Sequence, residues 1–389
     1  MGNNNVCLGE IQKNTINSGS PNTRWKREDL KSGSCVQSLI DKENNNFFKM
    51  VQCGPAIPYY RNEHSAQRWG QAIATLNQRD DVETTINLLY RKPEFEELVL
   101  LGPPKQYRWA TWEVLLTNGQ VQLSYEKYLE YMPNDIRIIL KDIDRTLINH
   151  ALFKHENCGQ EQLKRILCAI SNALPGVGYC QGMNFVCALT LIVSGCDEHK
   201  TFQCFMQMLT NEKHLLCFNF CNEMPLHYFF IKLIHYQIGK KFPKLNIRKV
   251  NDSLWISKMI LSLFIYVFKL DDCIRCWDYL MVRGMIRGIP ELILGFIDVT
   301  YKQLEQFKEE DYGFNFQGYE TSIIQFNVGE LIYAAKQKHK IERQLISRMA
   351  NKIRKSKPSQ LLDLLCHFDN IQTYKKHVDF YMKTIQDFN

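Results

Sequence analysis

The sequence lacks an apolar run long enough to cross a lipid bilayer. Its most apolar stretches are Met183 to Cys196 and Met259 to Phe268, and both are shorter than the roughly 20 residues that a spanning helix needs. The chain also has no positively charged leader followed by an apolar block near its start. These absences predict buried helices in a cytoplasmic protein that is not secreted.

The cysteines do not form a disulfide framework. The 14 cysteines are scattered along 389 residues, whereas disulfide scaffolds are short and dense in cysteine. We therefore expect reduced cysteines that pack as small core residues. Two patterns leave metal binding as an alternative, namely Cys273-x-x-Cys276 and the run from His214 to Cys221. The first has no second pair at zinc-finger spacing and the second is rich in aromatic residues, so we expect no metal site.

A nucleotide-binding glycine loop is also missing. The sequence contains no G-x-x-x-x-G-K-[ST] motif, which argues against a P-loop enzyme or a GTPase. Gly176, Gly178 and Gly182 are one residue off the dinucleotide-binding spacing, and a helical pattern precedes them where a strand would be needed. The chain is therefore expected to have no cofactor of its own.

Basic charge is concentrated near the C-terminus. The net charge is +7, and residues 336–357 hold nine basic residues against one Glu, which gives 9 − 1 = +8 for that segment and 7 − 8 = −1 for the remainder. A general nucleic-acid-binding protein is therefore not indicated. Ile341, Leu345, Met349 and Ile353 recur there at four-residue steps. We favour a C-terminal helix packed on the core with a solvated outer face; attraction to anionic cytoplasmic lipid is the alternative.

The first part of the chain differs in composition from the rest. Residues 1–47 are rich in Asn, Ser, Lys and Gly and have no hydrophobic period, which predicts a flexible tail. Gly2 and Cys7 resemble an incomplete myristoylation signal with a second acylation site, because valine stands where Ser or Thr is wanted. We favour an unmodified tail, and lipidation at Gly2 and Cys7 is the alternative. We predict a helical N-terminal extension over 48–94 and one large domain over 95–389.

A helical hydrophobic period runs through the chain from Phe47 onward, and strand signals are few. We therefore predict an all-α fold, a large helical array. The expected helices are 65–76, 82–90, 93–101, 109–116, 129–153, 160–174 and a series from Met183 to the C-terminus. Acidic residues follow Pro93 as in the first turn of a helix, and Asn118-Gly119 is expected to cap the fourth helix.

Ile139, Asp142 and Arg145 form the pattern I-x-x-D-x-x-R within the predicted helix 129–153. Residues three apart on a helix share a face, so Asp142 and Arg145 can pair. Taken alone, the pattern is as readily explained by a surface salt bridge on an amphipathic helix. A functional interpretation of this pattern therefore depends on the other motifs in the chain.

A second motif, Y-x-Q-G, is formed by Tyr179, Gln181 and Gly182. Proline and glycine just before it favour extended or irregular backbone, and on extended backbone residues two apart project to the same side. We therefore predict that Tyr179 and Gln181 face one partner.

Further motifs stand in a fixed order around these two. Arg108 and Trp112 form R-x-x-x-W upstream, and Ser253-Leu254-Trp255 and Arg275-Cys276-Trp277-Asp278 follow downstream. In this order and spacing the chain resembles the TBC domain, the family of GTPase-activating proteins for Rab GTPases. The resemblance covers about residues 95–299 clearly and the helices beyond them loosely.

The resemblance implies a fold and a set of residue roles. The fold would be of the TBC type, with two helical subdomains and a groove between them. Arg145 would be an arginine finger and Gln181 a glutamine finger that orients the attacking water, with Asp142, Tyr179 and Gly182 supporting them. The remaining motif residues would be structural: Arg108, Trp112, Ile139, Arg275, Trp277 and Asp278.

The resemblance also implies a function exerted on a partner. The protein would not be an enzyme by itself but would supply both fingers in trans to a GTP-bound Rab-family GTPase in vesicle trafficking, and GTP and Mg²⁺ would belong to that partner. An arginine finger in trans is worth on the order of 10³ to 10⁵ in hydrolysis rate. The alternatives are a Rab-binding effector or scaffold at membranes that does not stimulate hydrolysis, and a lipid-anchored helical scaffold. Peripheral contact with endomembranes is a further expectation to test.

Overall fold

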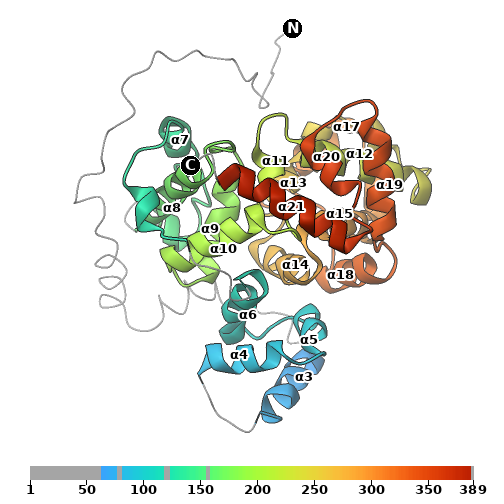
Figure 1. The fold of residues 1–389 in the computed structure, drawn as a ribbon. Coiled ribbons are helices and arrows are strands. Elements are labelled where there is room, and N and C mark those ends of the chain that lie inside the picture. Colours follow the sequence, from blue (N-terminus) through green and yellow to red (C-terminus); the bar gives the residue numbers. More distant parts are fainter. Residues whose placement is uncertain (1–62, 77–80, 118–122, 155–157, 387–389) are drawn as a thin grey trace.

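The computed structural model describes residues 63–76, 81–117, 123–154 and 158–386 (Figure 1). Within these ranges the regular structure consists of nineteen α-helices and short 3-10 helices, without a β-strand. The prediction of an all-α fold is therefore confirmed. The predicted tail 1–47, with Gly2 and Cys7, lies outside the described residues, as does Asn118-Gly119.

The helices fall into three groups in Figure 1. A small lobe holds α3 (Glu63–Ala74), α4 (Val82–Tyr90), α5 (Phe95–Leu101) and α6 (Lys105–Thr117). A second group holds α7 (Ile136–Ile143), α8 (Gly159–Ala173), α9 (Met183–Val193) and α10 (Glu198–Thr210), with the 3-10 helices η2 (Glu126–Leu129) and η3 (Ala151–Phe153).

The third group runs from α11 to the C-terminus. It holds α11 (Cys217–Phe220), α12 (Pro225–Lys241), η4 (Asn246–Lys249), η5 (Asp252–Leu254), α13 (Ile256–Leu261), α14 (Leu270–Arg283), α15 (Met285–Val299), α16 (Tyr301–Leu304), α17 (Glu309–Asn315), α18 (Val328–Gln337), α19 (Arg343–Arg354), α20 (Gln360–Leu365) and α21 (Ile371–Gln386). None of the helices in the described ranges is both long and apolar enough to cross a membrane.

One predicted helix is wrong. The sequence pattern predicted a helix over 129–153, but α7 covers only Ile136–Ile143 and turns follow it up to η3. After Ile143 the backbone N–H groups of Arg145 and Thr146 bond to carbonyls three residues back, and Leu147 then adopts a left-handed backbone with φ of 45°, which a helix cannot contain. Arg145 consequently lies in a turn just beyond the C-cap residue Asp144. The helix predicted to open at Pro93 also starts later, at Phe95, with Glu96 and Glu97 in its first turn.

A buried carboxylate joins the small lobe to α14. Asp278 is fully buried and accepts hydrogen bonds from Trp112 Nε1 at 2.8 Å and Arg108 Nε at 3.2 Å. Arg275 Nη1 donates to its other oxygen at 2.5 Å. The rings of Trp112 and Trp277 pack together with centroids 5.6 Å apart. A buried charge is tolerated when it is paired and fully hydrogen-bonded, so this junction fixes α6 against α14.

The C-terminal basic helix packs on the core, as predicted. Ile341 is fully buried, and Met349 and Ile353 on α19 are buried too. Glu291, fully buried on α15, accepts from the backbone N–H of Ile341 at 2.6 Å and from Arg283, which anchors the start of this segment.

The cysteines of the C-x-x-C motif lie in the core. Cys273 and Cys276 are fully buried on α14, and burial raises the pKa of both thiols. The part of the chain that the structure describes contains no group of three or more His, Cys, Asp or Glu residues that could hold a metal ion.

Candidate functional site

The first element of the site is a buried carboxylate that holds an exposed cation. The side chain of Asp142 is 2% exposed and that of Arg145 is 49% exposed. One carboxylate oxygen of Asp142 accepts from Arg145 Nε at 3.0 Å and from Arg145 Nη2 at 2.6 Å. Two bonds to one guanidinium fix its orientation as well as its position. Arg145 Nη1 has no hydrogen-bond partner within the described residues, so this end of the guanidinium is open to an incoming group.

Tyr179 ties the same carboxylate to the second motif. Its hydroxyl donates to the other oxygen of Asp142 at 2.7 Å, and its side chain is buried. Burial, together with the neighbouring Asp142 charge, raises the pKa of Tyr179 far above its ordinary value, so the hydroxyl remains a donor. Tyr179 therefore points inward while Gln181 is exposed. The prediction that both face one partner is wrong, because the backbone turns at Gln181 and Gly182 instead of staying extended.

The backbone before Gln181 is irregular, as predicted, and it is held by Asp135. This carboxylate accepts from the backbone N–H of Tyr179 at 2.7 Å and from the hydroxyl of Ser171 at 2.9 Å. Gly182 follows as the N-cap residue of α9, with φ of 112°. A Cβ at Gly182 would lie 2.5 Å from the carbonyl oxygen of Leu261 on α13. Only glycine fits this close approach at positive φ.

A second chain of buried hydrogen bonds joins the two motifs. The side-chain oxygen of Asn184 accepts from the backbone N–H of Gly182 at 2.9 Å, and its amide donates to the hydroxyl of Thr146 at 2.7 Å. The Thr146 hydroxyl donates in turn to the backbone carbonyl of Asp142 at 2.6 Å. Asn184 and Thr146 are both fully buried. The segments that carry Arg145 and Gln181 are therefore fixed to each other at two points.

Sequence reasoning missed Asp135, Thr146 and Asn184. A signal was available for one of them: Asn184 is the only amide side chain in the helix Met183–Val193, whose other residues are apolar except Thr190. A buried polar group needs a hydrogen-bond partner, so a lone amide there indicates a specific contact. Asp135 and Thr146 stand among other polar residues and carry no such signal.

Comparison with known proteins identifies the family. The family model described as the Rab-GTPase-TBC domain matches residues 105–305, which is 201 of 389 residues. The chain belongs to the Rab-GTPase-TBC domain family.

Relatives agree with this family over part of their length. The human ecotropic viral integration site 5 protein homolog is 26% identical over 56% of this chain and 26% of its own length. The Rab GTPase-activating protein eat-17 of Caenorhabditis elegans is 27% identical over 59% of this chain and 25% of its own length. The chain thus spans about a quarter of the length of these curated relatives.

A solved structure shows the same fold. The TBC domain of a Chlamydomonas flagellar RabGAP superposes with a TM-score of 0.54 at 15% identity, over 72% of this chain and 93% of that one. At this identity the similarity concerns the fold alone. Residues 105–305, which match the family model, contain both the Arg145 and the Gln181 segments.

Large apolar side chains are exposed on the segment that carries Arg145 in this TBC domain. Ile138, Leu140 and Ile148, which we call the apolar rim, are all large and exposed. Ile138 and Leu140 are on α7 and Ile148 follows in the turn after it. Exposed large apolar side chains close in sequence to a polar site are a feature of protein interaction surfaces.

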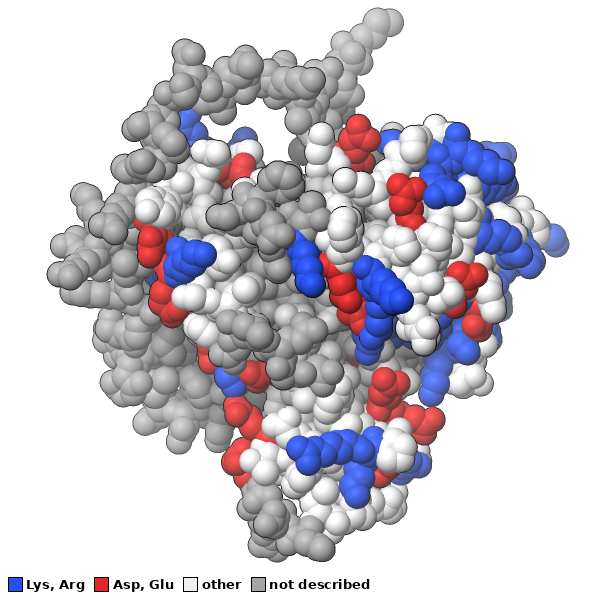
Figure 2. Space-filling model, in the orientation of Figure 1, with Lys and Arg blue, Asp and Glu red and all other residues white. Residues whose placement is uncertain are grey.

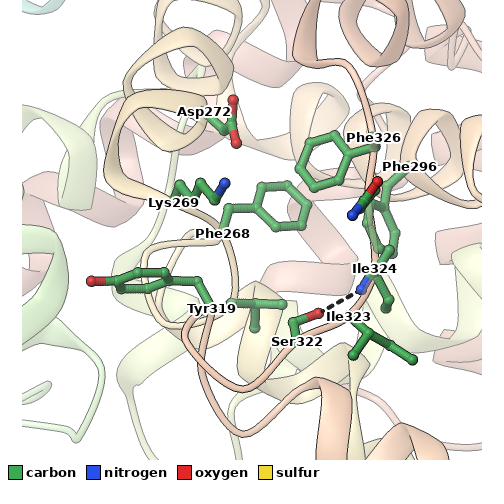
Figure 3. A pocket seen from close by; sticks show the side chains of 11 residues that line it. Phe268, Lys269, Asp272, Phe296, Tyr319, Ser322, Ile323, Ile324 and Phe326 are labelled. Atoms are coloured by element: carbon green, nitrogen blue, oxygen red, sulfur yellow. Dashed lines mark hydrogen bonds between the residues drawn. The ribbon is translucent and has the colours of Figure 1, made fainter. Parts of the chain in front are cut away.

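A pocket connects to this surface through a hydrogen-bonded loop. Asn149 Nδ2 donates to Glu320 at 2.6 Å, and the same carboxylate oxygen accepts from the hydroxyl of Tyr319 at 3.1 Å. Tyr319 lines a hollow of about 380 Å³, which we call the side pocket. Its lining is Val267, Phe268, Lys269, Asp272, Phe296, Tyr319, Ser322, Ile323, Ile324, Gln325 and Phe326 (Figure 3).

The side pocket has a mixed lining of aromatic, aliphatic, polar and charged side chains. The rings of Phe268 and Phe326 lie 4.8 Å apart between centroids, and Figure 3 shows Lys269 and Asp272 away from Phe326. Burial raises the pKa of Asp272 to about 6, against the lowering effect of Lys269. The rings of Phe268, Phe296 and Phe326 offer a contact for an apolar side chain beside these polar groups.

The other predicted motif residues form a separate cluster. Arg108, Trp112, Arg275, Trp277 and Asp278 make the junction of α6 and α14 described above. Ile139 is fully buried on α7. The structure thus brings Asp142, Arg145, Tyr179, Gln181 and Gly182 together and leaves the remaining motif residues elsewhere, buried or, for Arg108 and Arg275, half-buried.

Proposed function

We propose that this TBC domain stimulates GTP hydrolysis by a Rab-family GTPase, with Arg145 and Gln181 supplied in trans. The observation that carries the proposal is the shared carboxylate of Asp142, which binds Arg145 through one oxygen and Tyr179 of the glutamine loop through the other. One exposed cation and one exposed amide are thereby presented from two segments that are fixed to each other.

Each group has a distinct chemical task in the proposal. The guanidinium of Arg145 offsets the negative charge that develops on the transferring phosphoryl group, and Gln181 orients the attacking water. Asp142 orders the arginine side chain before the partner binds, which reduces the entropy lost on reaching the transition state. Arginine suits this role because its planar guanidinium stays charged and contacts several oxygens. GTP and Mg²⁺ belong to the partner.

The surface around the fingers supports docking of a folded partner. The apolar rim of Ile138, Leu140 and Ile148 would cover the partner's surface beside its nucleotide. The side pocket would receive an apolar side chain of the same partner, since Asn149, Glu320 and Tyr319 connect it to the turn that carries Arg145. Such a role on a Rab would place the protein in vesicle trafficking.

The test is single-turnover GTP hydrolysis with a panel of purified Rab GTPases. Arg145→Ala is expected to lower the stimulated rate by roughly a thousandfold or more, with some loss of thermal stability because the buried Asp142 carboxylate loses its paired cation. Gln181→Ala is expected to remove most of the stimulation with unchanged thermal unfolding. Arg91→Ala, an exposed arginine in the turn after α4, is the matched control and should retain full activity.

The same experiment distinguishes the proposed GTPase activator from a Rab-binding effector, the main alternative. A Rab-binding effector would bind the GTP-loaded partner and leave its hydrolysis rate unchanged. Stimulation that survives both finger substitutions would contradict the proposed roles of Arg145 and Gln181.

A further inference from the structure

Two segments far apart in the sequence carry positive charge and no negative charge. Residues 225–251 contain six Lys or Arg residues and no Asp or Glu, and residues 343–362 again contain six and none. The first segment is α12 with η4, and the second is α19 with the start of α20. Neither segment contains an acidic residue to form opposite-charge pairs along its own helix, although Arg354 on α19 pairs with Asp363 on α20.

The two segments lie beside each other in the fold. At the C-terminal end of α12, Lys241 Nζ donates to the backbone carbonyl of Lys338, just before α19. At its N-terminal end, Lys357, just after α19, places Nζ 4.8 Å from the ring centroid of Tyr228. The two helices therefore run antiparallel, and their positive charges add on one part of the surface.

The outer side of this pair is basic along both helices. Lys232, Tyr236 and Lys240 follow one another at four-residue steps on α12, and all three are exposed. Arg348 and Lys352 do the same on α19, and both are exposed. We call these five residues the basic face. In Figure 2, Lys and Arg side chains gather on the right of the view, where Figure 1 places α19.

The positive charge of the basic face is not neutralised locally. Lys240, Arg348 and Lys352 have no ion pair within the described residues. Lys232 contacts only the ring of Tyr228, at 5.2 Å from its centroid. The apolar side of α19 is buried in the core, so the face can act through charge and through Tyr236 but cannot insert a helix.

We propose that the basic face binds an anionic lipid membrane. Clusters of Lys and Arg on a helical surface attract anionic headgroups over a Debye length, and an exposed tyrosine suits the headgroup region. A single-stranded nucleic acid would need a row of aromatic side chains for stacking, and the face has one. This inference is independent of the proposed action on a Rab, because it uses none of the residues of the finger site.

The experiment is sedimentation of the full-length recombinant chain, without acylation, with phosphatidylcholine vesicles that contain or lack phosphatidylserine. Binding only to the anionic vesicles, weakened by added salt, is expected. Each basic residue at such a surface contributes a factor of about five. Lys240→Glu combined with Lys352→Glu should therefore weaken binding on the order of thirtyfold or more.

The matched control is Arg91→Glu combined with Lys92→Glu, which makes the same charge change at two exposed positions on the small lobe. It should bind anionic vesicles as the unmodified chain does, and both double variants should keep full activity on a soluble GTPase. The proposal is overturned if the chain ignores phosphatidylserine, if both double variants lose binding equally, or if a polyuridylate RNA binds while the vesicles do not.

Discussion

The side-chain amide of Asn184 donates a 2.7 Å hydrogen bond to the hydroxyl of Thr146, and both residues are fully buried. Asn184 lies in the first turn of α9, just after the Gln181 turn, and Thr146 follows Arg145 directly. This contact fixes the spacing of the two segments that carry Arg145 and Gln181. It does so independently of the hydrogen bond between Tyr179 and Asp142, which joins the same two segments. The relative position of the two finger segments is therefore set by the folded chain before any partner binds.

Asn184→Ala is expected to uncouple the two segments. The substitution leaves the backbone N–H of Gly182 without its acceptor, and an unsatisfied buried donor costs about 1–3 kcal/mol of the free energy of unfolding. The stimulated hydrolysis rate should fall on the order of tenfold to a hundredfold, since small errors in the position of a catalytic group are costly. Urea unfolding and single-turnover hydrolysis measure the two effects.

Thr190→Val is the control for this variant. It lies on the same helix, is fully buried, and loses only a hydrogen bond to the Val186 carbonyl within the helix. It should keep the stimulated rate. Equal loss of rate in both variants would show that general destabilisation of α9, and not the Asn184–Thr146 contact, sets the activity.

Gly182→Ala is expected to disturb the glutamine loop by backbone strain. A Cβ there meets the Leu261 carbonyl oxygen at 2.5 Å with φ at 112°, so the loop or α13 must shift, at a cost of about 1–3 kcal/mol. The stimulated rate should fall because Gln181 precedes the strained residue.

Gly70→Ala is the control: it lies on α3 with no atom within 4 Å of the added Cβ, and it should stabilise the protein by roughly 0.5–1 kcal/mol. An unchanged melting temperature for Gly182→Ala would contradict the argument.

The helical class and several helix ends could be predicted because local chemistry sets them. α4 covers 82–90 as predicted, and α9 starts at Met183, directly after a glycine. Leu147 shows the limit of this reasoning. Nothing in a leucine indicates a left-handed backbone, so the turn that carries Arg145 was predicted as helix.

The site was predicted only in part, for a related reason. The motifs located Asp142, Arg145, Tyr179 and Gln181, but the inward direction of Tyr179 depends on an acceptor 37 positions away. The hydrogen bond between Thr146 and Asn184 likewise joins residues 38 apart. Contacts of this kind are decided by how α7, α8 and α9 pack, which no local pattern specifies.

Ile323→Asp tests the side pocket as a docking element. Ile323 is 67% exposed at the edge of the pocket, so a carboxylate there should leave the fold intact. It should raise the KM for the Rab substrate about tenfold, because a charge opposes burial against an apolar side chain, and leave kcat nearly unchanged. Ile371→Asp, 52% exposed at the start of α21, is the control and should leave both constants unchanged. A fall in kcat with constant KM would contradict a docking role.

The titration of Asp272 in the side pocket should make the free energy of unfolding depend on pH. Burial raises the pKa of Asp272 from 3.8 to about 6, so between these values the folded protein binds more protons than the unfolded chain. The stabilisation from this group is complete below pH about 4 and is lost as the pH rises through about 6.

Asp272→Asn should therefore flatten that part of the curve of unfolding free energy against pH. At pH 8 the variant should be more stable than the unmodified protein by on the order of 1 kcal/mol, after allowance for partial solvent screening. Denaturant unfolding at pH 5 and pH 8 measures this, with Asp379→Asn, an exposed position on α21, as control. A larger gain at pH 5 than at pH 8 would reverse the sign and show that the Lys269 charge, and not burial, dominates at Asp272.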